Sequence, residues 1–170
     1  MNRKEVTEIF GVMMLAFPSA ELFKGGLEKL KPTIELWTSC TTDIDFWTGQ
    51  QAAKELCKTS KYPPTIAEFR EQAEQFMQRM TLYLDEVERR IKQGAYMLGS
   101  LDAYCDSIPQ GDIVRAAIGD IGGPSCLIRR LSNGDEIWEF DPLRRAITQR
   151  LRQKTPLPGS DRMALSEGGE

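Results

Sequence analysis

Two adjacent prolines, Pro63 and Pro64, constrain this chain more than any other feature. A proline ring fixes φ, removes an N–H donor and disfavours helix at the residue before it, so the backbone has to be extended here. Directly afterwards, Thr65 and Glu68 have the spacing of a capping box, in which each side chain binds the backbone N–H of the other residue. The sequence therefore predicts that a helix begins at Thr65.

The helix that begins there is predicted to be long and central to the fold. Apolar residues follow the capping box at intervals of three and four, which is the spacing of one face of an amphipathic helix. They are Ile66, Phe69, Ala73, Phe76, Met77, Met80, Leu84, Val87 and Ile91. This stripe extends over about seven turns at ~3.6 residues per turn. The first expected stop is Gln93-Gly94.

Further helices are predicted on both sides of the long one, again from apolar residues at helical spacing. Before the prolines, the expected segments are Arg3 to Ala16, Leu27 to Trp37 with an interruption at Pro32, and a helix from the start signal Thr41-Thr42-Asp43 to about Ser60. After Gly94, they are Tyr96 to Cys105, a short helix capped by Asp112 that stops at Gly122-Gly123-Pro124, and a last helix carrying Leu143, Ala146, Ile147 and Leu151.

The turn sequence Ser132-Asn133-Gly134-Asp135 leaves two interpretations open. In the first, residues 126–131 form another helical turn or two. In the second, residues 126–131 and 136–140 are the strands of a hairpin that turns through Asn133-Gly134. We favour the helical turn, so the expected fold class is all-α.

We expect a small multi-helix domain over residues 1–93, a looser helical unit over residues 94–155 and a flexible tail over residues 156–170. The tail is too polar and too rich in proline and glycine to order itself. An apolar content of 41% and a charged content of 28% are ordinary for a folded, soluble protein.

The composition argues against most catalytic chemistry. The 170 residues include no histidine, which excludes histidine catalysis and most zinc sites. The four cysteines, at positions 40, 57, 105 and 126, form no Cys-x-x-Cys pair and are expected to be core residues. No P-loop is present, and residues 119–124 are better explained as a helix stop. Nearby carboxylates such as Asp43 and Asp45 suit helix capping. We expect no enzyme, cofactor or metal site.

Charge and hydropathy narrow the range of partners and locations. The net charge of −3 opposes general binding to a nucleic-acid backbone. The first residues carry charges of both signs, and no run of about 18 apolar residues is present, so we see no export signal and no membrane span. We therefore expect a cytoplasmic protein with reduced thiols and no membrane partner.

The last predicted helix is the one local departure from this surface. Arg144, Arg145 and Arg152 lie opposite its apolar stripe, whereas Arg150 and Lys154 fall near the stripe. Such a helix suits an acidic partner surface or a nucleic-acid backbone. The alternative is a solvated helix whose cations favour its own C-terminus or are neutralised by acidic neighbours. We select Arg144, Arg145, Arg150 and Arg152 as candidate partner-binding residues.

Three motifs in the first half of the chain carry a family resemblance. They are Arg-Lys-Glu-Val-x-Glu-Ile-Phe from Arg3, Ile-Glu-Leu-Trp ending at Trp37, and the run from Lys58 to Glu68 around the prolines. Together they resemble the phage replicative-helicase loader/inhibitor family, best over residues 3–75. They are similar, more weakly, to the lambda-type replication protein that loads the host helicase. Residues 113–123, ending in Ile-Gly-Gly, resemble the second half of longer phage relatives.

The resemblance implies an adaptor without ATPase activity that binds a hexameric replicative helicase and controls its loading at the origin, in the host cytoplasm if phage-encoded. It also implies that the C-terminal part contacts the helicase, while the folded domain meets an origin-binding protein. The four arginines match no family motif, so their role is our own inference. Two alternatives stay open: a DNA-binding replisome organiser or regulator, in which Arg129 and Arg130 also meet phosphates, and a phage structural or tail-assembly component.

Overall fold

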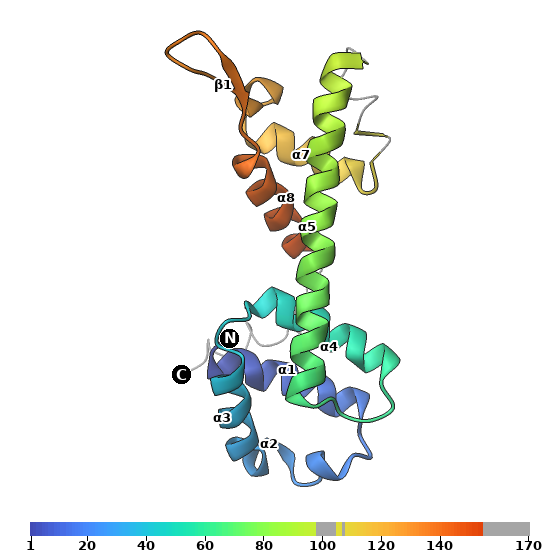
Figure 1. The fold of residues 1–170 in the computed structure, drawn as a ribbon. Coiled ribbons are helices and arrows are strands. Elements are labelled where there is room, and N and C mark those ends of the chain that lie inside the picture. The colour runs from blue at the N-terminus through green and yellow to red at the C-terminus, as the bar shows by residue number, and fades with distance from the viewer. Residues whose placement is uncertain (98–104, 107, 155–170) are drawn as a thin grey trace, which may run out of the picture. The chain divides into compact units, whose positions relative to one another are not determined.

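The computed structural model describes residues 1–97, 105, 106 and 108–154. Apart from one two-stranded sheet, the regular structure of these residues is helical, which confirms the expected all-α class. The chain forms two compact units, Met1–Thr81 and Leu82–Glu170, and helix α5 contributes residues to both (Figure 1). The domain limits expected at residues 93 and 155 stay predictions.

The first unit is built from short helices that precede the long one (Figure 1). Its elements are α1 (Arg3–Ala16), the 3₁₀ helix η1 (Glu21–Phe23), α2 (Gly26–Lys29), α3 (Lys31–Cys40), α4 (Phe46–Thr59) and the first part of α5 (Ile66–Met97). The bounds of α1 agree with the prediction. Pro32 does not interrupt a helix but lies in the first turn of α3, where its missing N–H costs nothing.

The start of α5 is confirmed in detail. The Thr65 N–H donates to the Glu68 carboxylate over 2.7 Å, and the Glu68 N–H donates to Thr65 Oγ1 over 3.3 Å. The expected stop at Gln93-Gly94 is wrong, since α5 continues to Met97. A single glycine costs a helix only about 1 kcal/mol relative to alanine, so the flanking residues carry the helix through it.

The start signal predicted for α4 was misplaced by a few residues. Asp45, rather than Thr41-Thr42-Asp43, is the N-cap, and its carboxylate accepts from the Thr48 N–H over 3.3 Å. Aspartate is among the best N-cap residues, and both positions satisfy that local rule. Asp43 instead forms a tertiary ion pair with Arg70, which no local pattern indicates.

Four aromatic rings hold the first unit together. Trp37 of α3 lies between Phe10 of α1 and Phe69 of α5, with ring centroids 5.1 and 5.2 Å away. Phe23 packs edge-on against Phe10 at 6.3 Å. Edge-to-face pairs at these distances add to the stabilisation from buried area. One continuous aromatic cluster therefore connects four elements of this unit.

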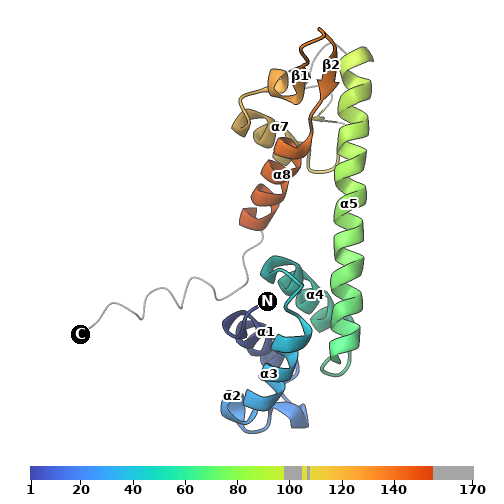
Figure 2. The same ribbon diagram turned by 60° about the vertical axis from the view of Figure 1, so that its left-hand side comes forward.

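The second unit is built around the later part of α5 (Figure 2). Its other elements are α7 (Gly111–Asp120), the 3₁₀ helix η2 (Pro124–Leu127), strands β1 (Ile128–Arg130) and β2 (Glu136–Trp138), and α8 (Asp141–Lys154). Asp112 is not the cap of α7 but lies in its first turn, because the chain enters through Gln110 in a left-handed conformation. The stop is confirmed: the Gly123 N–H donates to the Ile118 carbonyl over 2.9 Å.

The turn at Asn133-Gly134 closes a β-hairpin, so our preference for a helical turn was wrong. The strands pair antiparallel, with Ile128 opposite Trp138 and Arg130 opposite Glu136. Gly134 has φ +91°, which glycine adopts without strain. The helical interpretation holds only for η2, which directly precedes β1.

Some expectations cannot be assessed here. The predicted segment from Tyr96 to Cys105 and the predicted tail over residues 156–170 lie wholly or mostly outside the described residues. In the part of the chain that is described, no helix is both long and apolar enough to cross a membrane.

Gly111 provides a test of the packing at the start of α7. A Cβ on this residue would lie 1.7 Å from the carbonyl oxygen of Cys105, a backbone atom that cannot rotate away. We expect Gly111→Ala to lower the free energy of unfolding by about 2 kcal/mol or more, measured by urea denaturation. Gly119→Ala is the control, because a Cβ there would meet no atom within 4 Å. Equal losses in the two variants would contradict this packing.

Candidate interaction surfaces

Helix α8 has one buried face and one basic face. Its buried residues are Leu143, Ala146, Ile147 and Leu151. With ~3.6 residues per turn, Arg145 and Arg152 lie on the opposite side, and both are exposed. The helix predicted from the apolar stripe is therefore confirmed, and the question becomes what each arginine contacts.

Arg150 and Lys154 connect α8 to α7. The Arg150 guanidinium donates to both carboxylate oxygens of Asp120 over 2.5 Å, and Lys154 Nζ lies 3.2 Å from a carboxylate oxygen of Asp112. The hydrogen bond from Arg150 lowers the pKa of Asp120, and the one from Lys154 lowers the pKa of Asp112. Arg150 thus has a structural role that sequence alone left open.

Arg144 connects α8 to the later part of α5. Its guanidinium lies 2.5 Å from a carboxylate oxygen of Asp85 and also binds Glu88, whose side chain is only 19% exposed. The hydrogen bond with Glu88 is the main cause that raises the pKa of Arg144. Two of the four candidate arginines, Arg144 and Arg150, are therefore held within the second unit.

Arg145 and Arg152 present the remaining basic surface. They line a hollow of ≈ 430 Å³ together with Arg144, Thr148 and Gln149, all from α8. We call these five residues the basic face of α8. Because guanidinium groups form bidentate bonds to carboxylates and phosphates, this face can bind an acidic group of a partner.

The hairpin arginines are already paired within the hairpin region. Arg130 lies 2.7 Å from the Glu136 carboxylate, and Arg129 lies 3.9 Å from that of Glu139. These side chains are well exposed, so the pairs are weak in energy. They nevertheless reduce the positive charge that the DNA-binding alternative requires.

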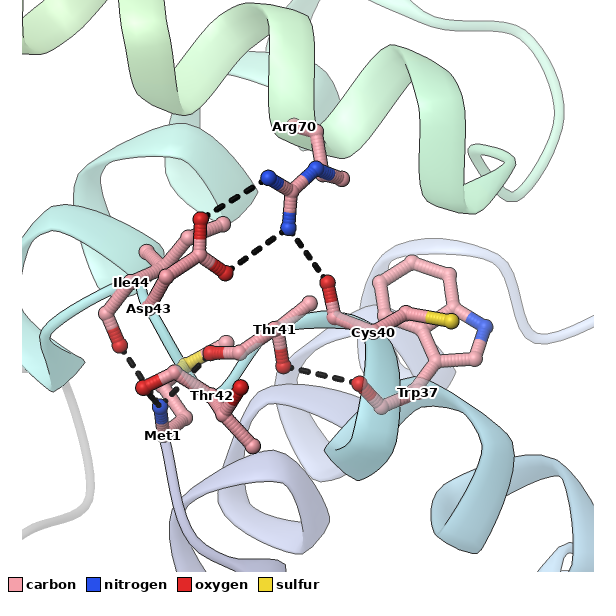
Figure 3. Close-up of polar contacts among 8 residues, drawn as sticks. All are labelled: Met1, Trp37, Cys40, Thr41, Thr42, Asp43, Ile44 and Arg70. Carbon is pink, nitrogen blue, oxygen red and sulfur yellow. Dashed lines mark hydrogen bonds and ion pairs between the residues drawn. The ribbon is translucent and has the colours of Figure 1, made fainter.

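In the first unit, the amino group of Met1 fixes the loop between α3 and α4 (Figure 3). It donates to the carbonyl oxygens of Thr41, Thr42 and Ile44 over 2.7, 3.3 and 2.6 Å. The Met1 side chain is buried, so this end of the chain packs into the core. The loop is thereby held by backbone contacts on its inner side.

Arg70 of α5 holds the same loop from the other side (Figure 3). Its two terminal nitrogens each lie 2.8 Å from an oxygen of Asp43, and one of them also binds the Cys40 carbonyl oxygen. The hydrogen bond from Arg70 is the main cause that lowers the pKa of Asp43. Sequence analysis missed this pair, since its partners are 27 positions apart in the chain.

Next to this pair lies a hollow of ≈ 730 Å³ between α4, its preceding loop and α5, which we call the acidic hollow. Four carboxylates and one guanidinium line it, together with several apolar side chains. The lining residues are Asp43, Ile44, Asp45, Thr48, Ala67, Arg70, Glu71, Ala73, Glu74 and Met77. This surface belongs wholly to the first unit.

The thiols are distributed less uniformly than the core expectation required. Cys105 is buried, as expected, and Cys40 and Cys57 are half-buried, with burial raising the pKa of Cys57. Cys126 is exposed, so its assignment to the core was wrong. Among the described residues, no three cysteine or acidic side chains are grouped so that they could hold a metal ion.

Comparison with known proteins finds one match. Residues 1–70 match the family model for the N-terminal domain of the gene 39 protein, a phage helicase loader. This match supports a phage helicase-loader family. It covers α1 to the first turn of α5, including the Met1 contacts and Arg70, and excludes the second unit. No curated protein and no solved structure matches the chain.

The different roles of neighbouring arginines can be separated by mutation. Arg144→Gln removes the charged donor of half-buried Glu88, so we expect the free energy of unfolding to fall by about 1 kcal/mol after allowance for solvent screening. Arg145→Gln removes the same charge from the exposed face, and we expect a change within about 0.5 kcal/mol. Urea denaturation measures both, and a reversed order would contradict the assigned contacts.

The carboxylates of Asp112 and Asp120 make stability depend on pH. Since folding lowers both pKa values from 3.8, the unfolded chain binds more protons in acid. Their contribution is complete above the unfolded pKa and is lost as the pH falls through the folded values. We expect the free energy of unfolding to decrease from about pH 5 towards pH 2. Urea denaturation should show a smaller decrease for Asp120→Asn, and an equal one would exclude this carboxylate as a cause.

Proposed function

We propose that this chain binds a hexameric replicative helicase and controls its loading at a replication origin, without ATPase activity of its own. The match of residues 1–70 to the N-terminal domain of the phage helicase loader carries this proposal. The second unit adds a surface that suits such a role, because Arg145 and Arg152 project from the same side of α8.

The basic face of α8 is the proposed helicase contact. Arg144 and Arg150 are bound to acidic side chains of α5 and α7, so α8 is held in place before any partner arrives. This differs from our expectation that a basic segment orders on the helicase. A preformed helix loses less conformational entropy on binding, which favours affinity.

The two alternatives have less support. Direct DNA binding requires unneutralised cations, whereas Arg129 and Arg130 are paired and the chain has a net charge of −3. Nothing in the described structure favours a phage structural or tail-assembly role.

Size-exclusion chromatography with the replicative helicase of the host or phage tests the proposal. We expect a stable complex, and we expect Arg145→Gln/Arg152→Gln to weaken it by about tenfold, because two charged contacts are lost. Arg129→Gln/Arg130→Gln is the matched control, since it removes the same charge from the same unit. Deleting residues 141–170 is unsuitable, because Leu143, Ile147 and Leu151 are core residues.

Absence of a complex would contradict the helicase-binding function itself. A complex that both double variants weaken equally would retain the function but contradict the assignment of the contact to the basic face. A chain ending at Lys154 separates the basic face from the residues that follow it, because loss of binding only in that chain would assign the contact to residues 155–170.

A further inference from the structure

The acidic hollow of the first unit combines three features of a protein-docking surface: depth, exposed apolar atoms and strong charge of one sign. We propose that it binds a cationic amphipathic segment of a partner protein, in which an apolar side chain lies between lysines or arginines. This inference is independent of the helicase contact proposed for α8, because it concerns a different unit and a different sign of charge.

The apolar part of the hollow centres on Met77. Its side chain is 47% exposed although it carries a flexible thioether, and Ile44 and Ala73 lie in the same lining. The Thr48 hydroxyl lies 3.2 Å from the Met77 sulfur, which holds one end of the side chain near α4. Exposed methionines of this kind adapt to differently shaped apolar side chains.

The charge of the hollow selects the partner. Four carboxylates and one guanidinium give its lining a formal charge of −3, equal to the net charge of the whole 170-residue chain. The rest of the chain is therefore neutral overall, and the acidic excess is equivalent to this one surface. Such a surface attracts a cationic segment and repels a nucleic-acid backbone.

Two of the carboxylates stay available for a partner. Arg70 is bound to Asp43, whereas Glu71 and Glu74 accept only from the neutral amides of Gln75 and Gln78, over 3.3 and 3.5 Å. Neither glutamate has an ion-pair partner among the described residues. Both are exposed and lie three residues apart on α5, so they are neighbours on one helix face.

The opposite wall of the hollow is fixed in advance. The loop that carries Asp43 and Asp45 is held by the Met1 amine on one side and by Arg70 on the other (Figure 3). Asp45 is fixed further, since its carboxylate caps α4. A surface that is already ordered loses little entropy when it binds.

A synthetic amphipathic peptide of lysine and leucine, about four helical turns long, is the probe, with a glutamate and leucine peptide as its counterpart. The full chain is labelled at its methionine methyl groups, and Met77→Leu assigns the Met77 signal. We expect the cationic peptide alone to shift that signal saturably. We expect Glu71→Gln/Glu74→Gln to weaken binding by about five- to tenfold, given two lost charge pairs.

Glu21→Gln/Glu35→Gln is the matched control, because it removes the same charge from exposed positions of the same unit outside the hollow. We expect it to change the affinity by less than about twofold. An unmoved Met77 signal, or equal weakening by both double variants, would overturn the proposal. Self-association that Glu71→Gln/Glu74→Gln abolishes would also overturn it, by assigning the hollow to a second copy of the chain. None of these results bears on the helicase contact of α8.

Discussion

The contact between Phe69 and Trp37 positions both the core and the polar surface of the first unit. Phe69 is fully buried and lies one residue before Arg70. Successive residues of a helix point about 100° apart, so burying Phe69 against Trp37 turns Arg70 towards the loop that carries Asp43. The capping box at Thr65 determines where this helix begins and therefore which residues face in each direction. The aromatic contact and the acidic hollow are two consequences of one helix start.

The second unit uses ion pairs for a different purpose. The apolar face of α8 provides the burial, and Arg144, Arg150 and Lys154 attach its margins to α5 and α7. Since such partly exposed pairs contribute little free energy individually, their main effect is to define the rotation of α8. That rotation leaves Arg145 and Arg152 exposed, so structural cations and candidate binding cations share one helix with separate roles.

The sequence predicted those elements whose signals are local. The bounds of α1 and the start of α5 follow from apolar spacing and from the Pro-Pro-Thr-Ile-Ala-Glu motif, and both agree with the structure. The roles of the four arginines do not follow from local patterns, because the residues that pair with Arg144 and Arg150 lie 30 to 59 positions away. The acidic hollow was missed for the same reason. The hairpin had a clear turn signal, but strands of three residues are too short to show a periodicity.

The hairpin itself bears on the solubility of the chain. A two-stranded ribbon has two outer edges, and backbone groups on an open edge can pair with a strand from another molecule. Here each strand has three residues, and Arg129 and Arg130 occupy two of the positions on β1. Short length and charge are both features by which natural sheets avoid edge-to-edge aggregation. The exposed isoleucines Ile128 and Ile137 are therefore tolerated without creating a template for fibrous assembly.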